Sequence, residues 1–529
     1  MNSAPFFELN PFQGVPGSVS GLRPRKNGPK VAVGESASHF FKKVGEDRAQ
    51  QARKIVQAIG ELPDKHVAFH MLRVAGDFCR MAYLARTTPG TQIADALASF
   101  DASVLAVLQR LVGTTLDAQQ WQQARLPARL GGLGLRGSQD HSDVAYLSSR
   151  MLTKDLCERH RRSQGWDPTV PGSHLGGALA RVKSRLTQGP AGHATSESGL
   201  KLVEKLMTGN AGELSAGGLQ QRLSRSMAVN AHESLMTVAE SRGELLTTAR
   251  MVAQRSEGSG RWFQATPSKT LDKHLTNAEF STALKLHLGV DVYEEESFCH
   301  FCGAVNDTQG IHARSCMGGG DQTLRHNACR DAVHAFCARA RLQPRLEAPG
   351  LLAETGDSQQ DGRRPADVLV CSRLGGPTLA ERAGGRASRL HALDFAVVNP
   401  MGLSRLSRQR GARPEPLEAA QAYADQKRGR VEAACAAKGV QSHPIVMEVT
   451  GGIEKKYARA VFHQIAAAMA EAEAIDEAEA LSEIVERISF EITRASAMAV
   501  LRRRKKTPAG TSMTAQLMKA AELLEVPEA

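Results

Sequence analysis

The chain has 529 residues, 67 Lys and Arg against 55 Asp and Glu, a formal net charge of +12, and 42% hydrophobic residues. This length exceeds one ordinary hydrophobic core and predicts about three domains. The hydrophobic fraction excludes wholesale disorder, and no apolar run approaches the roughly 20 residues of a membrane span. We therefore expect an intracellular protein outside the membrane. The basic excess permits a polyanionic partner such as nucleic acid without requiring one.

The N-terminal part of the chain changes texture once. Residues 1–45 are rich in Gly, Pro and Ser, which predicts an irregular lead-in. Residues 46–160 carry helical periodicity, with a second helix expected near 100–112, after a break at Pro89-Gly90. The stripe expected to face the core in the first helical run comprises Val67, Met71, Val74, Phe78 and Met81.

Residues 161–294 contain many Gly, Ser and Gln with short helical stretches, and we expect a loosely packed connector there. A clear helix closes this region. Thr276 or Asn277 is its expected N-cap, and Gly289 is its expected end. His287 falls on the apolar face of this helix, where a packed histidine is favoured over a ligand.

The rest of the chain alternates apolar strands with helices. Residues 367–371, 393–398 and 444–449 are short and apolar, as buried strands are, and a long helix lies between the last two. We therefore expect an α/β domain over residues 321–460. Residues 461–529 are expected to form C-terminal helices and a basic tail, so the predicted fold class is mixed. The basic block Arg502-Arg503-Arg504-Lys505-Lys506 suits phosphate contact or nuclear import.

Nine cysteines, an odd number scattered through a large chain, do not suggest a disulfide framework. Within residues 295–320, one cluster has the spacing of a metal site, with Gly303 placed to let the backbone turn beneath the ion. Its four members are Cys299, Cys302, His312 and Cys316. The spacing predicts a closed, tetrahedral, structural Zn²⁺ site whose binding energy supports local folding. Such a site has no open position for catalysis, and His300, His326 and Cys329 stay open as alternative ligands.

Two aspartates accompany the predicted strands. Asp367 opens one strand and Asp394 lies inside the next. Because a buried carboxylate is costly unless it is hydrogen-bonded or binds a cation, the two can converge on Mg²⁺ or Mn²⁺. Lys427 occupies an apolar position on the sheet-facing side of the following helix, from which it can reach carboxylates and a phosphate. The structural alternative also stays open: a snorkelling lysine, a strand cap, and an aspartate paired with an arginine.

The order of these motifs resembles the C-terminal part of a non-LTR retrotransposon reverse transcriptase protein. The matching motifs are Cys299-x2-Cys302, His312-x3-Cys316, Arg325-His326-Asn327, Arg364-Pro365-Ala366-Asp367, Leu393-Asp394 and the helix that carries Lys427. Upstream, the segment from Trp121 to Ser149, with Gly131-Gly132-Leu133-Gly134-Leu135-Arg136, is similar to the stretch after the polymerase palm. Residues 46–160 accordingly resemble a thumb-like region, and Trp262 to Gly289 resembles the lead into the zinc knuckle.

The resemblance implies a CCHC zinc knuckle followed by a restriction-endonuclease-like domain of the PD-(D/E)xK superfamily, which nicks DNA so that the exposed end primes reverse transcription. It implies that Asp367 and Asp394 bind catalytic Mg²⁺ or Mn²⁺, and that Lys427 stabilises charge on the scissile phosphate. The implied partners are DNA and, as a second option, the element's RNA, in the nucleus. The basic residues expected to contact nucleic acid are Arg325, Arg363, Arg364, Arg502, Arg503, Arg504, Lys505 and Lys506.

The chain also departs from the family pattern. Ala366 separates Pro365 from Asp367, an insertion around residues 375–388 lengthens the gap to Asp394, and Ala396 stands where the family's lysine is common. Lys427 must therefore supply that lysine from the next helix. A polymerase palm needs a carboxylate pair, usually two adjacent aspartates, and the 529 residues contain no such dipeptide, so we expect no reverse transcriptase activity from this chain alone.

Three functional hypotheses follow. The first is a metal-dependent DNA endonuclease derived from a retroelement. The second is a catalytically inactive, zinc-containing fragment that still binds nucleic acid. The third is a structural remnant without a defined role. The Asp367, Asp394 and Lys427 trio separates the first two hypotheses.

Overall fold

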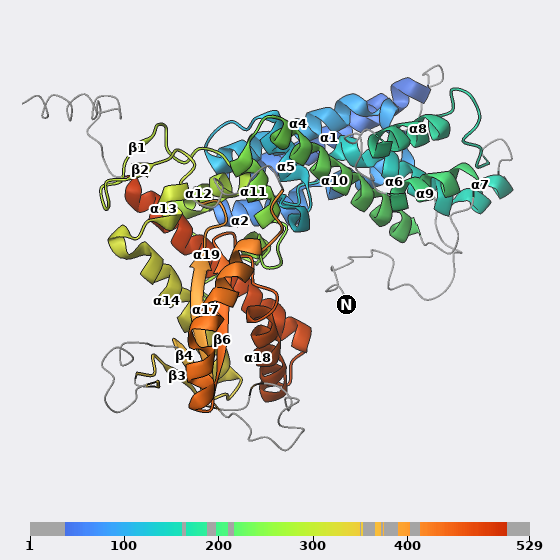
Figure 1. Ribbon diagram of the computed structural model, residues 1–529. Coiled ribbons are helices and arrows are strands. Elements are labelled where there is room, and N and C mark those ends of the chain that lie inside the picture. The colour runs from blue at the N-terminus through green and yellow to red at the C-terminus, as the bar shows by residue number, and fades with distance from the viewer. Residues whose placement is uncertain are drawn as a thin grey trace, which may run out of the picture.

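The computed structural model describes residues 37–160, 165–187, 197–209, 216–349, 351–352, 366–371, 374, 390–402 and 413–504. They form an elongated helical lobe and an α/β lobe set at an angle to it, with a small Cys/His segment beside the junction (Figure 1). None of the described helices is long and apolar enough to cross a membrane.

The helical lobe contains helices of very different lengths. They are α1 (Ala37–Gly60), α2 (Lys65–Met71), α3 (Ala82–Thr87), α4 (Ala94–Val112), α5 (Ala118–Arg125), α6 (Ser138–Leu152), α7 (Lys154–His160), α8 (His174–Thr187), α9 (Glu197–Met207), α10 (Ala216–Ser241), α11 (Leu245–Ala253) and α12 (Asn277–Leu288). Short turns lie between them: η1 (Leu72–Gly76), η2 (Phe78–Arg80), η3 (Gly90–Gln92), η4 (Ala128–Leu130) and η6 (Arg261–Phe263). Helix α1 starts at Ala37, so residues 37–45 belong to a helix and not to an irregular lead-in. Residues 1–36 lie outside the described part of the chain.

The buried stripe predicted for the first helical run is wrong in its first half. Val67, Met71 and Val74 are 36%, 40% and 64% exposed, whereas Phe69 and Leu72 are fully buried. The segment is not one continuous helix, because α2 passes into the π-helical turn η1 and then into the 3₁₀ turn η2. A π turn takes more residues than an α turn and therefore shifts the buried face from Leu72 onward, whereas Val67 and Met71 are exposed on α2 itself. Further along, Phe78 and Met81 are buried, as predicted.

The loosely packed connector predicted for residues 161–294 is also wrong. Helices α8, α9 and α10 share a core with α6, in which Leu147, Leu179, Val182, Leu206 and Leu223 are buried. Leu and Val at helical spacing build this core within a Gly-, Ser- and Gln-rich composition. The later part of the same region joins the main core of the lobe through Trp262, Phe263 and Phe280.

Helix α12 begins and ends as the sequence predicts. Thr276 is its N-cap, in a reciprocal capping box with Glu279. Gly289 ends it in the left-handed conformation, at φ 67°. His287 is a packed histidine, because its side chain is buried and Nε2 lies 3.1 Å from the Gly131 carbonyl oxygen.

The glycine-rich motif after α5 forms a tight loop. The Gly134 N–H donates to the Leu126 carbonyl at 2.9 Å. A side chain at Gly132 would place its Cβ 2.0 Å from that same oxygen, so only glycine fits there. The loop inserts Leu133 and Leu135 into the main core, where both are fully buried. This motif therefore has a structural explanation within the helical lobe.

The α/β lobe is built around a four-stranded sheet. Its elements are α14 (Asp321–Arg339), β3 (Pro344–Leu346), β4 (Val368–Val370), β5 (Leu390–Val398), α17 (Glu418–Ala437), β6 (Val440–Glu448), α18 (Ala458–Glu473) and α19 (Glu477–Arg503). The strand order is β3-β4-β5-β6. Neighbours are antiparallel except β5 and β6, which run parallel and are joined through α17. The three predicted strands and the helix between the last two are confirmed.

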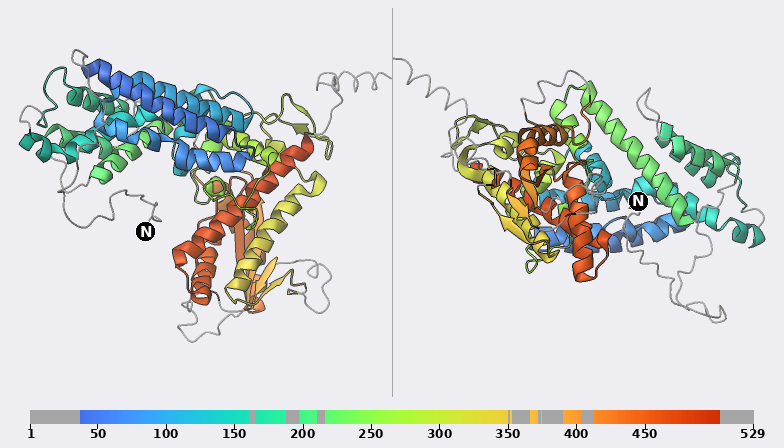
Figure 2. Two further views of the ribbon diagram at one scale, coloured as in Figure 1. Left: turned by 180° about the vertical axis from the view of Figure 1, so that it is seen from behind. Right: turned by 60° about the horizontal axis from the view of Figure 1, so that its bottom comes forward.

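Helices cover both faces of this sheet. Helices α14, α18 and α19 pack on one face, around Val368, Leu393 and Ile445, and α17 packs on the other, around Ala392 and Val446. The predicted boundary at residue 460 is wrong, because α18 and α19 complete this core and are not a separate tail. Without them, one apolar face of the sheet would be exposed. Figure 2 shows α19 running beside α14 from the sheet toward the Cys/His segment.

Candidate active site and metal centre

The first two cysteines of the Cys/His segment lie on a tight turn between β1 (Ser297–Phe298) and β2 (Val305–Asn306). The N–H groups of Cys302 and Gly303 donate to the Cys299 carbonyl at 3.3 and 2.7 Å. Gly303 has φ 74°, the left-handed conformation that glycine adopts without strain. The turn thereby brings the sulfur atoms of Cys299 and Cys302 to one side of the hairpin.

A short helix, α13 (Ile311–Ser315), supplies the second ligand pair. The Asp307 carboxylate accepts the N–H groups of Ile311 and His312 at 2.9 and 2.7 Å, which fixes the start of the helix. His312 therefore lies in the first turn, and Cys316 follows the last residue of the helix. This brings the His312 and Cys316 side chains to the two cysteines of the turn.

The four candidate ligand atoms converge as a tetrahedral metal site requires. All lie within 4.8 Å of one another. Cys302 Sγ is 3.3 Å from His312 Nε2 and 3.5 Å from Cys316 Sγ, and Cys299 Sγ is 3.8 Å from Cys316 Sγ. Zn–S bonds of about 2.3 Å in a tetrahedron place ligand atoms about 3.8 Å apart. The cluster can thus hold a metal ion such as zinc.

The alternative zinc ligands lie elsewhere. Cys329 is buried in the core beneath the sheet, and burial raises the pKa of its thiol to about 12. His300 packs against Phe301, with the two ring centres 4.1 Å apart. His326 bonds to Asp367 in the carboxylate site below. None of the three belongs to the converging set of described residues.

Arg503 joins the metal cluster to α19. Its side chain is fully buried, Nη1 lies 2.5 Å from Asp321 Oδ2, and Nη2 donates to the Gly318 carbonyl at 3.1 Å. Burial opposes the charged form, but hydrogen bonds to Asp321 and to the sulfur atoms of Cys316 and Cys299 outweigh burial and raise the pKa of Arg503. A cation beside three thiolates offsets the net negative charge of a Cys₃His zinc site.

For two of the arginines predicted to contact nucleic acid, the prediction is wrong because both are buried. Arg503 is enclosed as described, and Arg325 is 3% exposed and donates to the Arg314 carbonyl at 2.9 Å. Neither guanidinium can reach a phosphate in this fold. Arg502 pairs with Asp321 at 2.5 Å but keeps 37% of its side chain exposed, and Arg504 donates to the Val292 carbonyl. The other four, Arg363, Arg364, Lys505 and Lys506, lie outside the described residues.

The two strand aspartates meet at the start of β4. The Asp367 N–H donates to the Leu393 carbonyl at 3.0 Å, so Asp367 lies next to Asp394 across the antiparallel pair. The two carboxyl groups are within hydrogen-bond reach of each other. The antiparallel register of β4 and β5 thus makes Asp367 and Asp394 neighbours, although they are 27 positions apart in the sequence.

Lys427 reaches this pair from α17. Its Nζ forms an ion pair with Asp394 Oδ1 and donates to the Phe395 carbonyl at 2.8 Å. Only 18% of the lysine side chain is exposed. The snorkelling alternative is therefore wrong, and the partner of Asp394 is this lysine and not an arginine. The Asp367 carboxylate accepts a hydrogen bond from the Phe395 N–H at 2.7 Å. This backbone contact agrees with the alternative in which Asp367 caps a strand.

His326 is the member of the site that the sequence interpretation missed. It lies in the second turn of α14, and its Nε2 is 3.1 Å from Asp367 Oδ2. The sequence signal was the Arg325-His326-Asn327 motif, but the sequence interpretation considered His326 only as an alternative zinc ligand. Helix α14 and the β4 to β5 register together bring it to the carboxylates.

The charges of the site are unevenly distributed. Burial raises the pKa of Asp394 to about 6 against the opposing effect of Lys427, and the charge of Asp367 adds to the rise. Burial also acts to raise the pKa of Asp367, but the hydrogen bonds from His326 and the Phe395 N–H outweigh it, and this pKa is lowered. The bond to Asp367 in turn raises the pKa of His326. A close carboxylate pair of this kind is stabilised by a proton or a divalent cation.

Besides their contact with each other, each of the two carboxyl groups uses one oxygen in bonds to other residues. Oδ2 of Asp367 accepts from His326 and Phe395, and Oδ1 of Asp394 accepts from Lys427. Among the described residues, no lysine, histidine or backbone N–H donates to the other oxygen of either group. The side chains of Asp367 and Asp394 keep 18% and 16% exposure, so the site is largely enclosed but still reaches the solvent.

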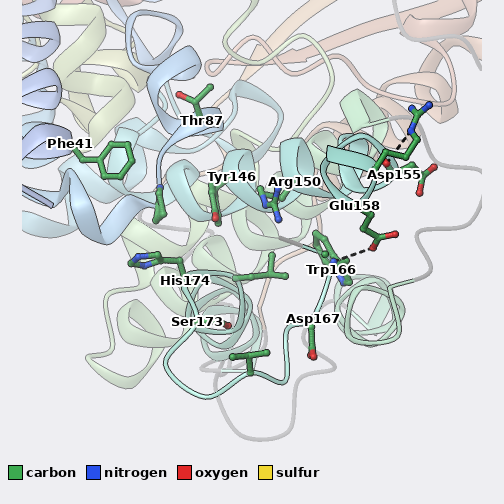
Figure 3. Close-up of a pocket in the computed structure, with 15 residues that line it drawn as sticks. Phe41, Thr87, Tyr146, Arg150, Asp155, Glu158, Trp166, Asp167, Ser173 and His174 are labelled. Carbon is green, nitrogen blue, oxygen red and sulfur yellow. Dashed lines mark hydrogen bonds between the residues drawn. The ribbon is translucent and has the colours of Figure 1, made fainter. Parts of the chain in front are cut away.

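A separate cavity of about 1310 Å³ lies in the helical lobe between α6, α7 and the start of α8 (Figure 3). Its lining carries charges of both signs, including Arg150, Asp155 and Glu158. Trp166 Nε1 donates within the lobe to the Leu206 carbonyl at 2.8 Å, and Arg150 lies 2.9 Å from the Cys157 sulfur. These internal contacts favour no particular ligand chemistry for the cavity.

Comparison with known protein families and with curated protein sequences finds no match to this chain. The resemblance to non-LTR retrotransposon proteins therefore stays a prediction from the motifs.

Proposed function

We propose that this chain is a retroelement-derived, metal-dependent DNA endonuclease that nicks target DNA and lacks a polymerase palm. The observation that carries the proposal is the convergence of Asp367, Asp394 and Lys427 at one partly exposed site. The trio combines two oxygen ligands with one cation, as hydrolysis of a phosphodiester requires. The order of the other matching motifs, from the segment at Trp121 to the Cys/His cluster, adds support from the sequence.

Each side chain has a distinct role in this proposal. Asp367 and Asp394 would hold Mg²⁺ or Mn²⁺ through their carboxylate oxygens. The bound ion supplies a Lewis acid that neutralises phosphate charge and activates water. Lys427 places its ammonium group beside the carboxylates, where it stabilises the charge that develops on the scissile phosphate. The contact with the Phe395 carbonyl holds Nζ at the strand.

The zinc cluster has a structural role in the same proposal. Only four residues lie between Cys316 and Asp321, the first residue of α14, and α14 carries His326. Arg503 and Asp321 then link the cluster, α14 and α19. Zinc thereby fixes the start of a helix that reaches the carboxylate site. DNA in the nucleus is the proposed substrate, and the exposed part of Arg502 is one candidate phosphate contact.

A second candidate function is nucleic-acid binding without cleavage. The observation that favours it is the Lys427 to Asp394 ion pair, since a lysine held by an aspartate can serve structure alone. In that case the basic surfaces would still bind DNA. Binding through phosphate contacts weakens steeply as salt rises, whereas a salt-insensitive affinity would indicate a protein partner instead.

A plasmid-nicking assay tests the proposal. The zinc-loaded wild-type chain should convert supercoiled plasmid to open circles with Mg²⁺ and not with EDTA. Asp394→Asn removes a ligand charge at nearly constant shape and should abolish nicking. Glu432→Gln removes an exposed carboxylate on α17, outside the site, and should leave nicking unchanged. Equal nicking by the wild type and Asp394→Asn would defeat the mechanism. Absence of nicking from both, with salt-dependent DNA binding retained, would support the inactive alternative.

A further inference from the structure

Helix α14 contributes a side chain to the carboxylate site that neither aspartate motif contains. We propose that His326 is a positioning residue, which orients Asp367 so that one carboxylate oxygen faces the metal. This inference rests on the proposed metal-dependent function, because it assigns the orientation of a proposed metal ligand. It adds a residue 41 positions from Asp367 to the working parts of the site.

Two hydrogen bonds fix the orientation of the Asp367 carboxylate. Oδ2 accepts two hydrogen bonds, from the Phe395 N–H at 2.7 Å and from His326 Nε2 at 3.1 Å. The terminal torsion of an aspartate is broad, so one hydrogen bond alone leaves the carboxylate plane free to turn. Two donors from different elements, β5 and α14, restrict that rotation. The other oxygen, Oδ1, is then presented to a cation instead of being exchanged with Oδ2.

Neighbouring residues hold His326 itself in place. Its Nδ1 lies 3.3 Å from Asn327 Oδ1, and its ring meets the Phe395 ring edge-on, with ring centres 6.4 Å apart. The start of α14 is fixed by Asp321, whose carboxylate binds both Arg502 and Arg503. Helix α14, Asn327 and the Phe395 ring therefore position the imidazole independently of its contact with Asp367.

Partial exposure separates this histidine from a core histidine. The His326 side chain is 30% exposed, whereas the packed His287 is 7% exposed as a residue. A partly exposed histidine has little apolar burial to contribute. Among the described residues, Asp367 is the charged partner of its ring, beside the aromatic contact with Phe395. Residues that orient a metal ligand in this way typically change metal affinity or activity by about 10- to 100-fold when removed.

The variants separate positioning from packing. His326→Ala removes the donor, and we expect about a 10-fold rise in the Mg²⁺ concentration that gives half-maximal nicking. His326→Gln restores an amide N–H donor near the position of Nε2 and should recover part of that shift. His334→Ala changes another partly buried histidine on α14, away from the carboxylates, and should match the wild type. A purely structural role would lower the melting temperature without this metal-dependent rescue by Gln.

The experiment measures nicking of supercoiled plasmid against Mg²⁺ concentration for these three variants and the wild type, all zinc-loaded. It also measures Mn²⁺ binding in solution by electron paramagnetic resonance, counting only the site that Asp394→Asn eliminates. The inference is supported if His326→Ala weakens Mn²⁺ binding and Gln partly restores it. It is overturned if Ala leaves both metal dependences unchanged, if Gln is no better than Ala, or if the wild type has no such Mn²⁺ site. A wild type that binds Mn²⁺ but never nicks refutes the proposed function, while the Mn²⁺ affinities still decide the role of His326.

Discussion

Lys427 on α17 and Asp394 on β5 form an ion pair between the helix layer and the sheet, although 33 residues separate them in the chain. Both side chains are largely enclosed, with 18% and 16% exposure. The lysine is held a second time by the Phe395 carbonyl at 2.8 Å. A charged lysine directed inward at a carboxylate pair is the feature of the α/β lobe that packing alone explains least.

Replacing this lysine tests its proposed role in cleavage. Lys427→Met should reduce nicking by at least about 100-fold, because it removes the cation that stabilises phosphate charge. The fold should survive, since Asp394 can take up a proton when its partner is lost. Initial nicking rates at saturating Mg²⁺ provide the measurement, and circular dichroism checks folding. Lys43→Met, an exposed lysine on α1, is the charge-matched control. Comparable rates for Lys427→Met and the wild type would exclude the lysine from the chemistry.

The zinc cluster predicts a metal content that depends on Cys302. Cys302→Ser should lower bound zinc from about one ion per chain to a small fraction, because a closed site needs all four ligands. Residues 295–340 should lose protection in hydrogen exchange, since metal binding supplies local folding energy. Cys79→Ser alters an exposed cysteine in the helical lobe and should change neither quantity. Unaltered zinc content in the Cys302 variant, by elemental mass analysis, would count against the cluster.

Arg503 predicts a link between α19 and metal retention. Arg503→Leu removes the cation beside the thiolates and leaves Asp321 with Arg502 as its remaining partner. We expect zinc affinity to fall by about 10-fold or more, measured by competition with a chelator. Arg502→Leu is the matched comparison, because it also pairs with Asp321 but is 37% exposed. The order of the two effects is the decisive result: an equal or larger loss in the Arg502 variant would refute a special role for Arg503.

His66 predicts part of the acid sensitivity of the helical lobe. Burial, with a smaller effect of His274, lowers the pKa of His66 from 6.5 to about 4. Between these two pKa values, His66 is therefore protonated in the unfolded chain and neutral in the folded chain. The free energy of unfolding is therefore unaffected by His66 above about pH 6.5 and decreases as the pH falls toward 4. The decrease is about 2 kcal/mol at pH 5.

Substitution of this histidine should flatten the pH profile. His66→Asn keeps a side-chain acceptor for the Leu275 N–H, which donates to His66 Nδ1 at 3.2 Å, and removes the titrating ring. The free energy of unfolding, from denaturant titrations at about pH 7.5 and pH 5, should fall less with acid than in the wild type. His463→Asn, on exposed α18 surface, should retain the wild-type slope. An unchanged slope in the His66 variant would show that other groups dominate the acid response.

Short-range features of this protein were predictable from the amino-acid sequence. The metal cluster spans residues 299–316, so its spacing favoured the four side chains that converge, with His300, His326 and Cys329 left as alternatives. The cap at Thr276, the end at Gly289 and the three apolar strands likewise depend on neighbouring residues. Lys427 was also detectable, since a charged residue interrupts an apolar helix face. In each case the physical cause lies within a few turns of chain.

Burial, in contrast, was decided by tertiary structure. Arg503 belongs to a basic run that suggests an exposed tail, yet Asp321 and the cluster enclose it. Val67 on α2 and Val74 in the π-helical turn η1 fit a core stripe, yet both are exposed. Whether a side chain is buried depends on which distant element packs above it, and no local pattern contains that information.

The composition of the carboxylate site divides in the same way. The sequence by itself determined the candidates Asp367, Asp394 and Lys427, because polar residues within apolar elements are conspicuous. Only the tertiary structure decided that His326 joins them, through strand register and the packing of α14 on the sheet. The physical reason is that a hydrogen bond across 41 residues depends on the relative placement of whole elements, which the assembled core alone establishes.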